Sequence, residues 1–196
     1  MSEDKYHHGD LKETLIKNGI KLLNEGGCDN FSMRKLASLC NVSHAAPYKH
    51  FKNKDEIIDA VMKYVLQELE NALEYVADKY KDDPQRLTVE LGKQYVKFMV
   101  NNPDYLKILF LSDFATKIVV KDENIESEFK AFNILKENAV RAFKMCGIKE
   151  DDYARNIVAM WAMVHGISIM IANKTVIYDG DVEKLVEDIL VHNMTF

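Results

Sequence analysis

The fold of this chain is decided by the stretch Ser32-Met-Arg-Lys-Leu-Ala-Ser-Leu-Cys-Asn-Val-Ser-His-Ala-Ala-Pro-Tyr-Lys-His-Phe51. Ser32 is a good helix N-cap, and Asn41 can take the left-handed conformation that a tight turn demands. Ser43 can cap a further helix, in which Pro47 removes at most the first internal hydrogen bond. The pattern predicts two short helices joined by a tight turn. The alternative is that Pro47 breaks the second helix into a loop.

This stretch is also basic, although the protein as a whole is acidic. Between Asn30 and Lys54 the sequence has no Asp or Glu, whereas the whole chain has a formal net charge of −5. The cationic and histidine side chains there are Arg34, Lys35, Lys49, Lys52, Lys54, His44 and His50. A small, cation-bearing helix pair is suited to a DNA groove, and an ordinary exposed basic face is the plainer alternative.

Helical periodicity divides the segment after Ser43 into two faces. At about 100° per residue, Pro47 and Phe51 share a buried face, and Ala45 and Lys49 lie opposite. Small alanines allow close approach to base edges, and Lys49 is a long donor. The predicted base-facing residues are His44, Ala45, Ala46 and Lys49. The predicted phosphate-binding residues are Tyr48, His50 and Lys54, with Ser32 and Ser43 at helix N-termini that favour anions.

The rest of the chain predicts an all-α protein. It is 47% hydrophobic, and Pro and Gly are scarce, at 3 and 8 residues. Counting the helix after Ser43, about nine helices are expected, the others over 11–25, 33–39, 54–80, 85–101, 103–113, 126–145, 151–173 and 181–192. We expect a three-helix head over 1–53, with its helix-turn-helix at 32–51, and a larger helical domain over 54–196. The helix at 54–80, roughly 40 Å long, should bridge the two.

The larger domain is rich in soft and aromatic side chains, which either form a packed core or line an apolar cavity. The candidate pocket residues are Tyr95, Phe98, Met99, Phe110, Phe114, Phe132, Met160, Trp161 and His165. His165 fits a hydrogen-bonded core histidine better than a ligand contact. Residues 157–172 are apolar on nearly all sides, so a partner subunit is the expected cover. The candidate dimer-interface residues are Val164, Gly166, Ile167, Ile171, Val182, Leu185, Val186 and Ile189.

Several classes of function are disfavoured by the same sequence. Cys28, Cys40 and Cys146 form no C-x-x-C pair, which favours bystander thiols in a cytoplasmic protein over a disulfide framework or a zinc site. We expect no metal, no cofactor, no signal peptide and no membrane span. The sequence has no paired-carboxylate, Ser-His-Asp, Cys-His or Gly-rich phosphate signature, so an enzyme is not expected.

The head resembles the TetR family of bacterial repressors. The resemblance rests on Phe31-Ser-Met-Arg-Lys-Leu-Ala and on Val42-Ser-x-x-x-x-Tyr48-Lys-His-Phe-Lys-Asn-Lys54, and it covers about residues 6–62. Tyr6-His-His-Gly-Asp-Leu11 and His44-Ala-Ala-Pro-Tyr48 are similar to the branch named for a C-terminal Trp-His-Gly motif. That motif corresponds to Trp161-Ala-Met-Val-His165-Gly166. The chain departs from the family at Asn41, where Gly is usual.

The resemblance implies a ligand-responsive transcriptional regulator, most simply a repressor. It would bind a pseudo-palindromic operator as a homodimer and be released by a small, largely apolar effector. The family's DNA contacts carry over to the base-facing and phosphate-binding residues above and to Arg34. The alternative is a helical protein-interaction module, or a non-specific DNA-binding module, without an effector response.

Overall fold

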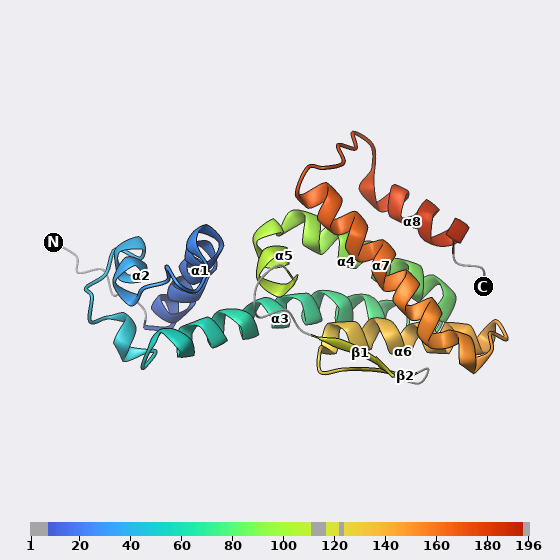
Figure 1. The fold of residues 1–196 in the computed structure, drawn as a ribbon, viewed down its shortest axis with the longest axis horizontal. Helices are drawn as coiled ribbons and strands as arrows, with labels where there is room; N and C mark the ends of the chain where they lie inside the picture. The colour runs from blue at the N-terminus through green and yellow to red at the C-terminus, as the bar shows by residue number, and fades with distance from the viewer. Residues whose placement is uncertain (1–7, 111–116, 122–123, 194–196) are drawn as a thin grey trace. The chain divides into compact units, whose positions relative to one another are not determined.

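A computed structural model describes residues 8–110, 117–121 and 124–193 of the chain, and it is almost entirely helical (Figure 1). The all-α prediction is therefore confirmed. The elements are α1 (His8–Gly26), α2 (Met33–Leu39), the 3₁₀ turn η1 (Pro47–Lys49), α3 (Lys54–Lys79), α4 (Pro84–Asn101), α5 (Pro103–Phe110), β1 (Ile118–Lys121), β2 (Asn124–Ser127), α6 (Lys130–Met145), the 3₁₀ turn η2 (Glu150–Asp152), α7 (Tyr153–Ala172) and α8 (Val182–Asn193).

The chain divides into two compact units. The first comprises Met1–Leu66 and Lys107–Ala115, and the second comprises Gln67–Leu106 and Thr116–Phe196. Helix α3 contributes its first half to one unit and its second half to the other. Its inward stripe is fully buried at Ile57, Val61, Val65, Leu69 and Leu73, which repeat every four residues as the apolar pattern predicts.

The first unit packs α1 against α2. Helix α1 ends at Gly26 because Gly27 adopts φ +63°, and the Gly27 amide donates to the Leu23 carbonyl at 2.8 Å. Ser32 caps α2 by accepting a hydrogen bond from the Lys35 amide at 3.1 Å. The cap at Ser32 confirms the expectation from the sequence.

The turn after α2 forms as predicted, but the segment beyond it is not an α-helix. Asn41 has φ +53°, in the left-handed region. From Ser43 to Ala46 the chain makes a turn in which the Ala46 amide donates to the Ser43 carbonyl at 2.9 Å. Pro47 has no amide hydrogen for that carbonyl, so the α-helical bond is missing and a single 3₁₀ turn follows. The prediction of a full helix after Ser43 was therefore wrong.

The second unit is built around α4, which packs against α6, α7 and α8 (Figure 1). Pro84 opens α4, and the Asp83 carboxylate caps it by accepting from the Arg86 amide at 3.1 Å. Helix α8 lies very close to α4 at Gly92. A β-carbon placed there would come within 2.5 Å of Leu190 Cδ1 and 3.3 Å of Val164 Cγ1. This glycine is what allows α7 and α8 to approach α4.

An antiparallel hairpin lies where no strand was expected. Strand β1 pairs with β2 from Ile118–Ser127 to Lys121–Asn124. The helix predicted to begin at residue 126 begins instead at Lys130, because the β-branched run Ile118-Val119-Val120 favours a strand that takes 124–127 as its partner. The Ser127 hydroxyl ties the hairpin to α6, since it accepts from the Phe129 amide at 3.1 Å.

Helix α7 is long and apolar enough to meet a length-and-composition test for a membrane span, over Glu150–Ala172. The core helix of a globular protein passes the same test, and α7 packs against α4 and α6. Of the 18 most apolar consecutive residues in this stretch, 28% are buried within one copy of the chain. Two large apolar side chains of α7, Val158 and Met170, are exposed.

Candidate DNA-binding surface and effector cavity

The side chains predicted to meet DNA lie mostly at the surface of the first unit. Those exposed are Arg34, Ser43, His44, Ala45, Tyr48 and Lys49, and those half-buried are Ser32, Ala46, His50 and Lys54. Pro47 and Phe51 are buried, so the predicted division into an outward and an inward side is correct. The outward set carries hydroxyl, imidazole and ammonium donors beside two alanine methyl groups, which is the chemistry that phosphates and base edges require.

Two members of this set also have structural contacts. The Lys54 ammonium donates to the Cys28 carbonyl at 2.7 Å, and so joins the start of α3 to the loop before α2. The His50 side chain places Nε2 in the interior, where it has no hydrogen-bond partner among the described residues. The bond from Lys54 to Cys28 was not visible in the sequence, because its partners lie 26 residues apart along the chain.

A small cavity lies inside the second unit. It has a volume of about 30 Å³, is partly open to the surface, and is lined by side chains from four helices. Its lining consists of Thr88, Leu91, Gly92, Phe132, Leu135, Lys136, Ala139, Ile157, Met160, Trp161, Val164 and Leu190. Three predicted pocket residues, Phe132, Met160 and Trp161, are among them. Lys136, the charged residue among the described lining residues, was not predicted.

An aromatic cluster surrounds Trp161 at the wall of this cavity. Phe132 meets its ring edge-on at 5.2 Å between centroids, and Tyr95 lies at 5.0 Å. His165 stacks on the indole at 5.6 Å with an interplanar angle of 11°. Tyr95 Oη and His165 Nδ1 are hydrogen-bonded at 2.9 Å. His165 is thus a hydrogen-bonded histidine beside the cavity, as its position on an apolar helix indicated.

The other predicted pocket residues lie elsewhere or outside the described chain. Met99 is fully buried in α4, and Phe98 pairs with Tyr105 at 5.9 Å between ring centroids. Phe110 ends α5 and belongs to the first unit, so it is not in the lining. Phe114 lies outside the described residues.

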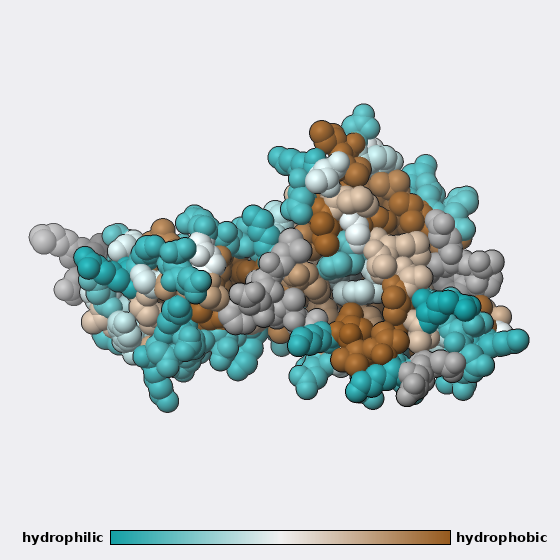
Figure 2. Space-filling view, viewed as in Figure 1, coloured by the Kyte–Doolittle hydropathy of each residue, from teal (hydrophilic) through white to brown (hydrophobic). Residues whose placement is uncertain are grey.

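The predicted interface residues of α7 and α8 differ in exposure. Val164, Ile167 and Val186 are buried by their own protomer. Those half-buried are Gly166, Ile171, Val182, Leu185 and Ile189. The large apolar side chains that are exposed on these helices are Val158, Met170 and Val191, which helical periodicity did not single out. Figure 2 shows further apolar surface over the loop that joins α7 to α8, where Ile177 is 89% exposed.

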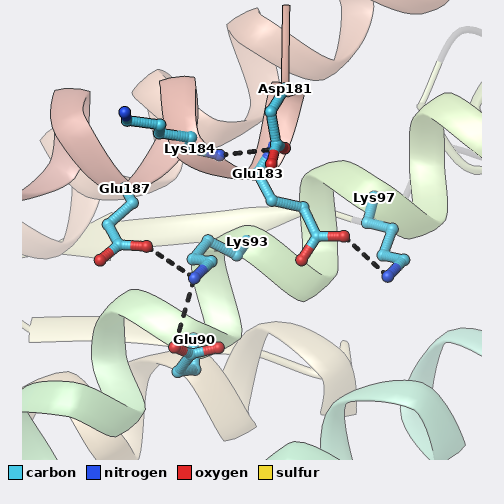
Figure 3. A network of polar contacts seen from close by, with 7 residues as sticks. All are labelled: Glu90, Lys93, Lys97, Asp181, Glu183, Lys184 and Glu187. Atoms are coloured by element: carbon cyan, nitrogen blue, oxygen red, sulfur yellow. Dashed lines mark hydrogen bonds and ion pairs between the residues drawn. The ribbon is translucent and has the colours of Figure 1, made fainter.

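Ion pairs hold α8 to α4 beside the cavity (Figure 3). The Lys93 ammonium lies 2.7 Å from Glu187 and 3.3 Å from Glu90, and Lys97 lies 2.7 Å from Glu183. Burial alone would lower the pKa of Lys93, but the hydrogen bonds that its ammonium donates to Glu187 and Glu90 outweigh burial and raise the pKa above its ordinary value. Because Leu190 of the same helix lines the cavity, this set of ion pairs fixes one of its walls.

His165 makes the stability of the protein depend on pH. Burial lowers the pKa of its imidazole below the ordinary value of 6.5. The unfolded chain therefore binds more protons than the folded chain just below pH 6.5, so the free energy of unfolding falls as the pH falls through that window. We expect urea midpoints measured between pH 7.5 and 5.5 to fall less in His165→Gln than in the wild type. Equal slopes in the two proteins would contradict the assignment.

The first unit is a helix-turn-helix domain of the DNA-binding class, joined to a separate helical unit with an internal cavity. Residues 15–61 match the model of the family described as bacterial regulatory proteins, tetR family. The chain therefore carries a TetR-type N-terminal domain, which confirms the family resemblance of the head.

Individual repressor proteins also resemble the N-terminal part of this chain in sequence. The chain is 44% identical over 57 residues to the tetracycline repressor protein class G of Vibrio anguillarum. The matched segment covers 29% of this chain and 27% of that protein. The chain spans between about a quarter and two-fifths of the length of the first curated relatives that it matches.

Two solved structures share the whole fold. A putative fatty acid metabolism regulator of Clostridium perfringens has a TM-score of 0.70 at 16% identity, covering 91% of this chain and 95% of that chain. AibR in complex with isovaleryl coenzyme A and operator DNA has a TM-score of 0.64 at 19% identity, covering 92% and 95%.

Proposed function

We propose that this protein is a ligand-responsive transcriptional repressor that acts in the cytoplasm as a homodimer on a pseudo-palindromic operator. The observation that carries the proposal is the TetR-type head, in which a capped α2 and a left-handed Asn41 turn precede an outward surface of Ala45, Tyr48 and Lys49. The stacking of Trp161 on His165 supports membership of the Trp-His-Gly branch.

DNA recognition divides between two kinds of contact. His44, Ala45, Ala46 and Lys49 face the bases of one half-site. The phosphates are bound by a second set of residues, namely Ser32, Arg34, Ser43, Tyr48, His50 and Lys54. A short 3₁₀ turn presents Lys49, so few side chains reach base edges and each carries a large share of the specificity.

Dimerisation uses α7 and α8. Val158, Met170 and Val191 are exposed apolar side chains on these helices, and Gly166 has nothing within 4 Å of where its β-carbon would lie. A second copy related by a two-fold axis covers such a surface with the same surface. The half-buried residues Ile171, Val182, Leu185 and Ile189 complete the proposed interface.

Effector binding uses the cavity beside Trp161. A protein of the same fold has been solved with both isovaleryl coenzyme A and operator DNA, so this fold accommodates both ligands. In the present chain, α3 contributes residues to both units over its 26 residues, and it is the element through which an effector would alter the spacing of the two heads. An effector shifts the equilibrium only if it binds the non-operator state more tightly.

The proposal is tested by anisotropy titrations with DNA from the chain's own upstream region, at several salt concentrations. We expect Lys49→Ala to change preference among single-base operator variants by about tenfold at one position. We expect Lys54→Ala to weaken all sites about equally and to reduce the salt slope by about one. A thermal melt of Lys54→Ala separates the loss of its hydrogen bond to Cys28 from the loss of a phosphate contact.

The same titrations also distinguish the proposed repressor from the alternative function. Binding that is independent of sequence, or a uniform loss of affinity in both variants, would favour a non-specific DNA-binding or protein-interaction module. Lys144→Ala, an exposed lysine at the end of α6, is the charge-matched control and should leave both affinity and preference unchanged.

A further inference from the structure

We propose that the effector is a short-chain carboxylate, whose anionic group pairs with Lys136 and whose tail enters the cavity beside Trp161. This inference rests on the proposed effector response and specifies its chemistry. The cavity is lined by apolar side chains almost throughout, and the polar groups in its described lining are the Thr88 hydroxyl, the Lys136 ammonium and the indole N–H of Trp161. Of these groups, the Lys136 ammonium carries a charge, so it decides which charge on a ligand is favoured.

Lys136 supplies a cation whose charge is not neutralised within the described chain. Its side chain is half-buried on α6, and its Nζ donates to the Ile125 carbonyl of β2 at 3.4 Å, a long distance for such a bond. Among the residues that the structure describes, no carboxylate lies within ion-pair distance of it. An ammonium group has three donors, so at least two remain for a ligand.

Thr88 cannot replace Lys136 as the donor. Its buried hydroxyl donates to the Pro84 carbonyl at 2.8 Å, so its one hydrogen is already used inside α4. No Asp or Glu belongs to the lining, and a cationic ligand would therefore face Lys136 without a counter-charge. The site selects against cations and prefers an anion to a neutral molecule of the same shape.

The size of the cavity limits the tail. A volume of 30 Å³ admits about two to three water-sized groups, whereas sites for drug-sized ligands measure about 300–1,000 Å³. A tail of a few carbon atoms fits without rearrangement. A longer tail needs a larger space, so one or more of the lining side chains would have to move.

The test uses the intrinsic fluorescence of Trp161, which is the chain's single tryptophan and lines the cavity. The full-length protein is titrated with butanoate and with butanamide, which differ in charge and hardly in shape. We expect butanoate to bind about tenfold more tightly. Lys136→Met should bring the two ligands to equal affinity, and Lys136→Arg should retain the preference. Lys144→Met, on the same helix but exposed, is the matched control and should behave as wild type.

A series of carboxylates of increasing chain length tests whether the ligand enters the cavity beside Trp161. Affinity should rise from acetate to butanoate and stop rising by octanoate, and Ala139→Leu should abolish the response to all of them by filling the cavity. Equal binding of butanoate and butanamide to the wild type would overturn the carboxylate assignment and leave the proposed effector response standing. Specific operator binding that no carboxylate alters, together with an unchanged Trp161 signal, would overturn this inference alone. Absence of specific operator binding would instead refute the proposed function.

Discussion

Phe51→Ala is expected to abolish operator binding by destabilising the first unit. The Phe51 side chain is 3% exposed, and its ring lies 5.8 Å from the Lys12 ammonium. Truncating a buried phenylalanine leaves a cavity and costs about 3–5 kcal/mol of the free energy of unfolding. Because Phe51 ends the segment that presents Lys49, this loss also releases the DNA-facing surface. Urea unfolding followed by circular dichroism measures the stability, and anisotropy measures the DNA affinity.

Tyr48→Ala is the matched control, because Tyr48 is an aromatic residue three positions away whose side chain is 57% exposed. Its removal should change the free energy of unfolding by less than about 0.5 kcal/mol, as is usual for surface sites. It should nevertheless weaken operator binding through the lost phosphate contact. If Phe51→Ala unfolds at the same urea concentration as Tyr48→Ala, the division between the buried and outward sides is wrong.

Gly92→Ala and Gly166→Ala should have opposite effects on stability. Both glycines lie inside helices, so each alanine gains about 1 kcal/mol of helix propensity. At Gly166 nothing lies within 4 Å of the new methyl group, and that gain should appear in full in the monomer. At Gly92 the methyl group would lie 2.5 Å from Leu190 Cδ1, an overlap that costs about 1–3 kcal/mol. We expect Gly92→Ala to be less stable than Gly166→Ala by about that amount.

Sedimentation of the same pair tests the dimer. Gly166→Ala should weaken self-association even though it stabilises each protomer, because its methyl group stands on the helix that meets the second copy. Gly92→Ala should lower stability through displacement of α8 from α4. Equal melting temperatures for the two variants would show that Leu190 moves aside at no cost. If Gly166→Ala associates as strongly as the wild type, Gly166 does not lie in the dimer interface.

The helices were predictable from local signals that depend on neighbouring residues alone. Ser32, Gly27 and Asn41 each fix the backbone within a few residues, and each behaves in the structure as its chemistry requires. The stripe of α3 was equally clear, because a helix buried along one side repeats its apolar residues at helical spacing over 26 residues.

The two misread segments failed for different physical reasons. Pro47 removes a hydrogen bond at the first turn of the helix, where no earlier helical bonds exist, so the helix does not nucleate there. At β1, the β-branched run Ile118-Val119-Val120 was a usable strand signal, but a two-stranded hairpin is weak alone. Its position depends on α6, through Ser127 and the Lys136 bond to Ile125.

The candidate sites were predictable to unequal degrees. The DNA-facing set is contiguous in sequence, so periodicity and charge were sufficient to identify it. The cavity joins residues from α4, α6, α7 and α8, which are as far apart as Thr88 and Leu190. Trp161 and Phe132 could be predicted because aromatic side chains commonly line ligand cavities. Lys136 could not be predicted, since a lysine on an amphipathic helix ordinarily faces solvent.

The division of the chain into units has a consequence for how the protein folds during synthesis. The unit that contains the helix-turn-helix also includes Lys107–Phe110, which follow α4 and the first half of α5 in the chain. The first 66 residues therefore leave the ribosome before this part of their own unit has been made. A fragment that ends at residue 66 would lack the contacts that Lys107–Phe110 make within that unit.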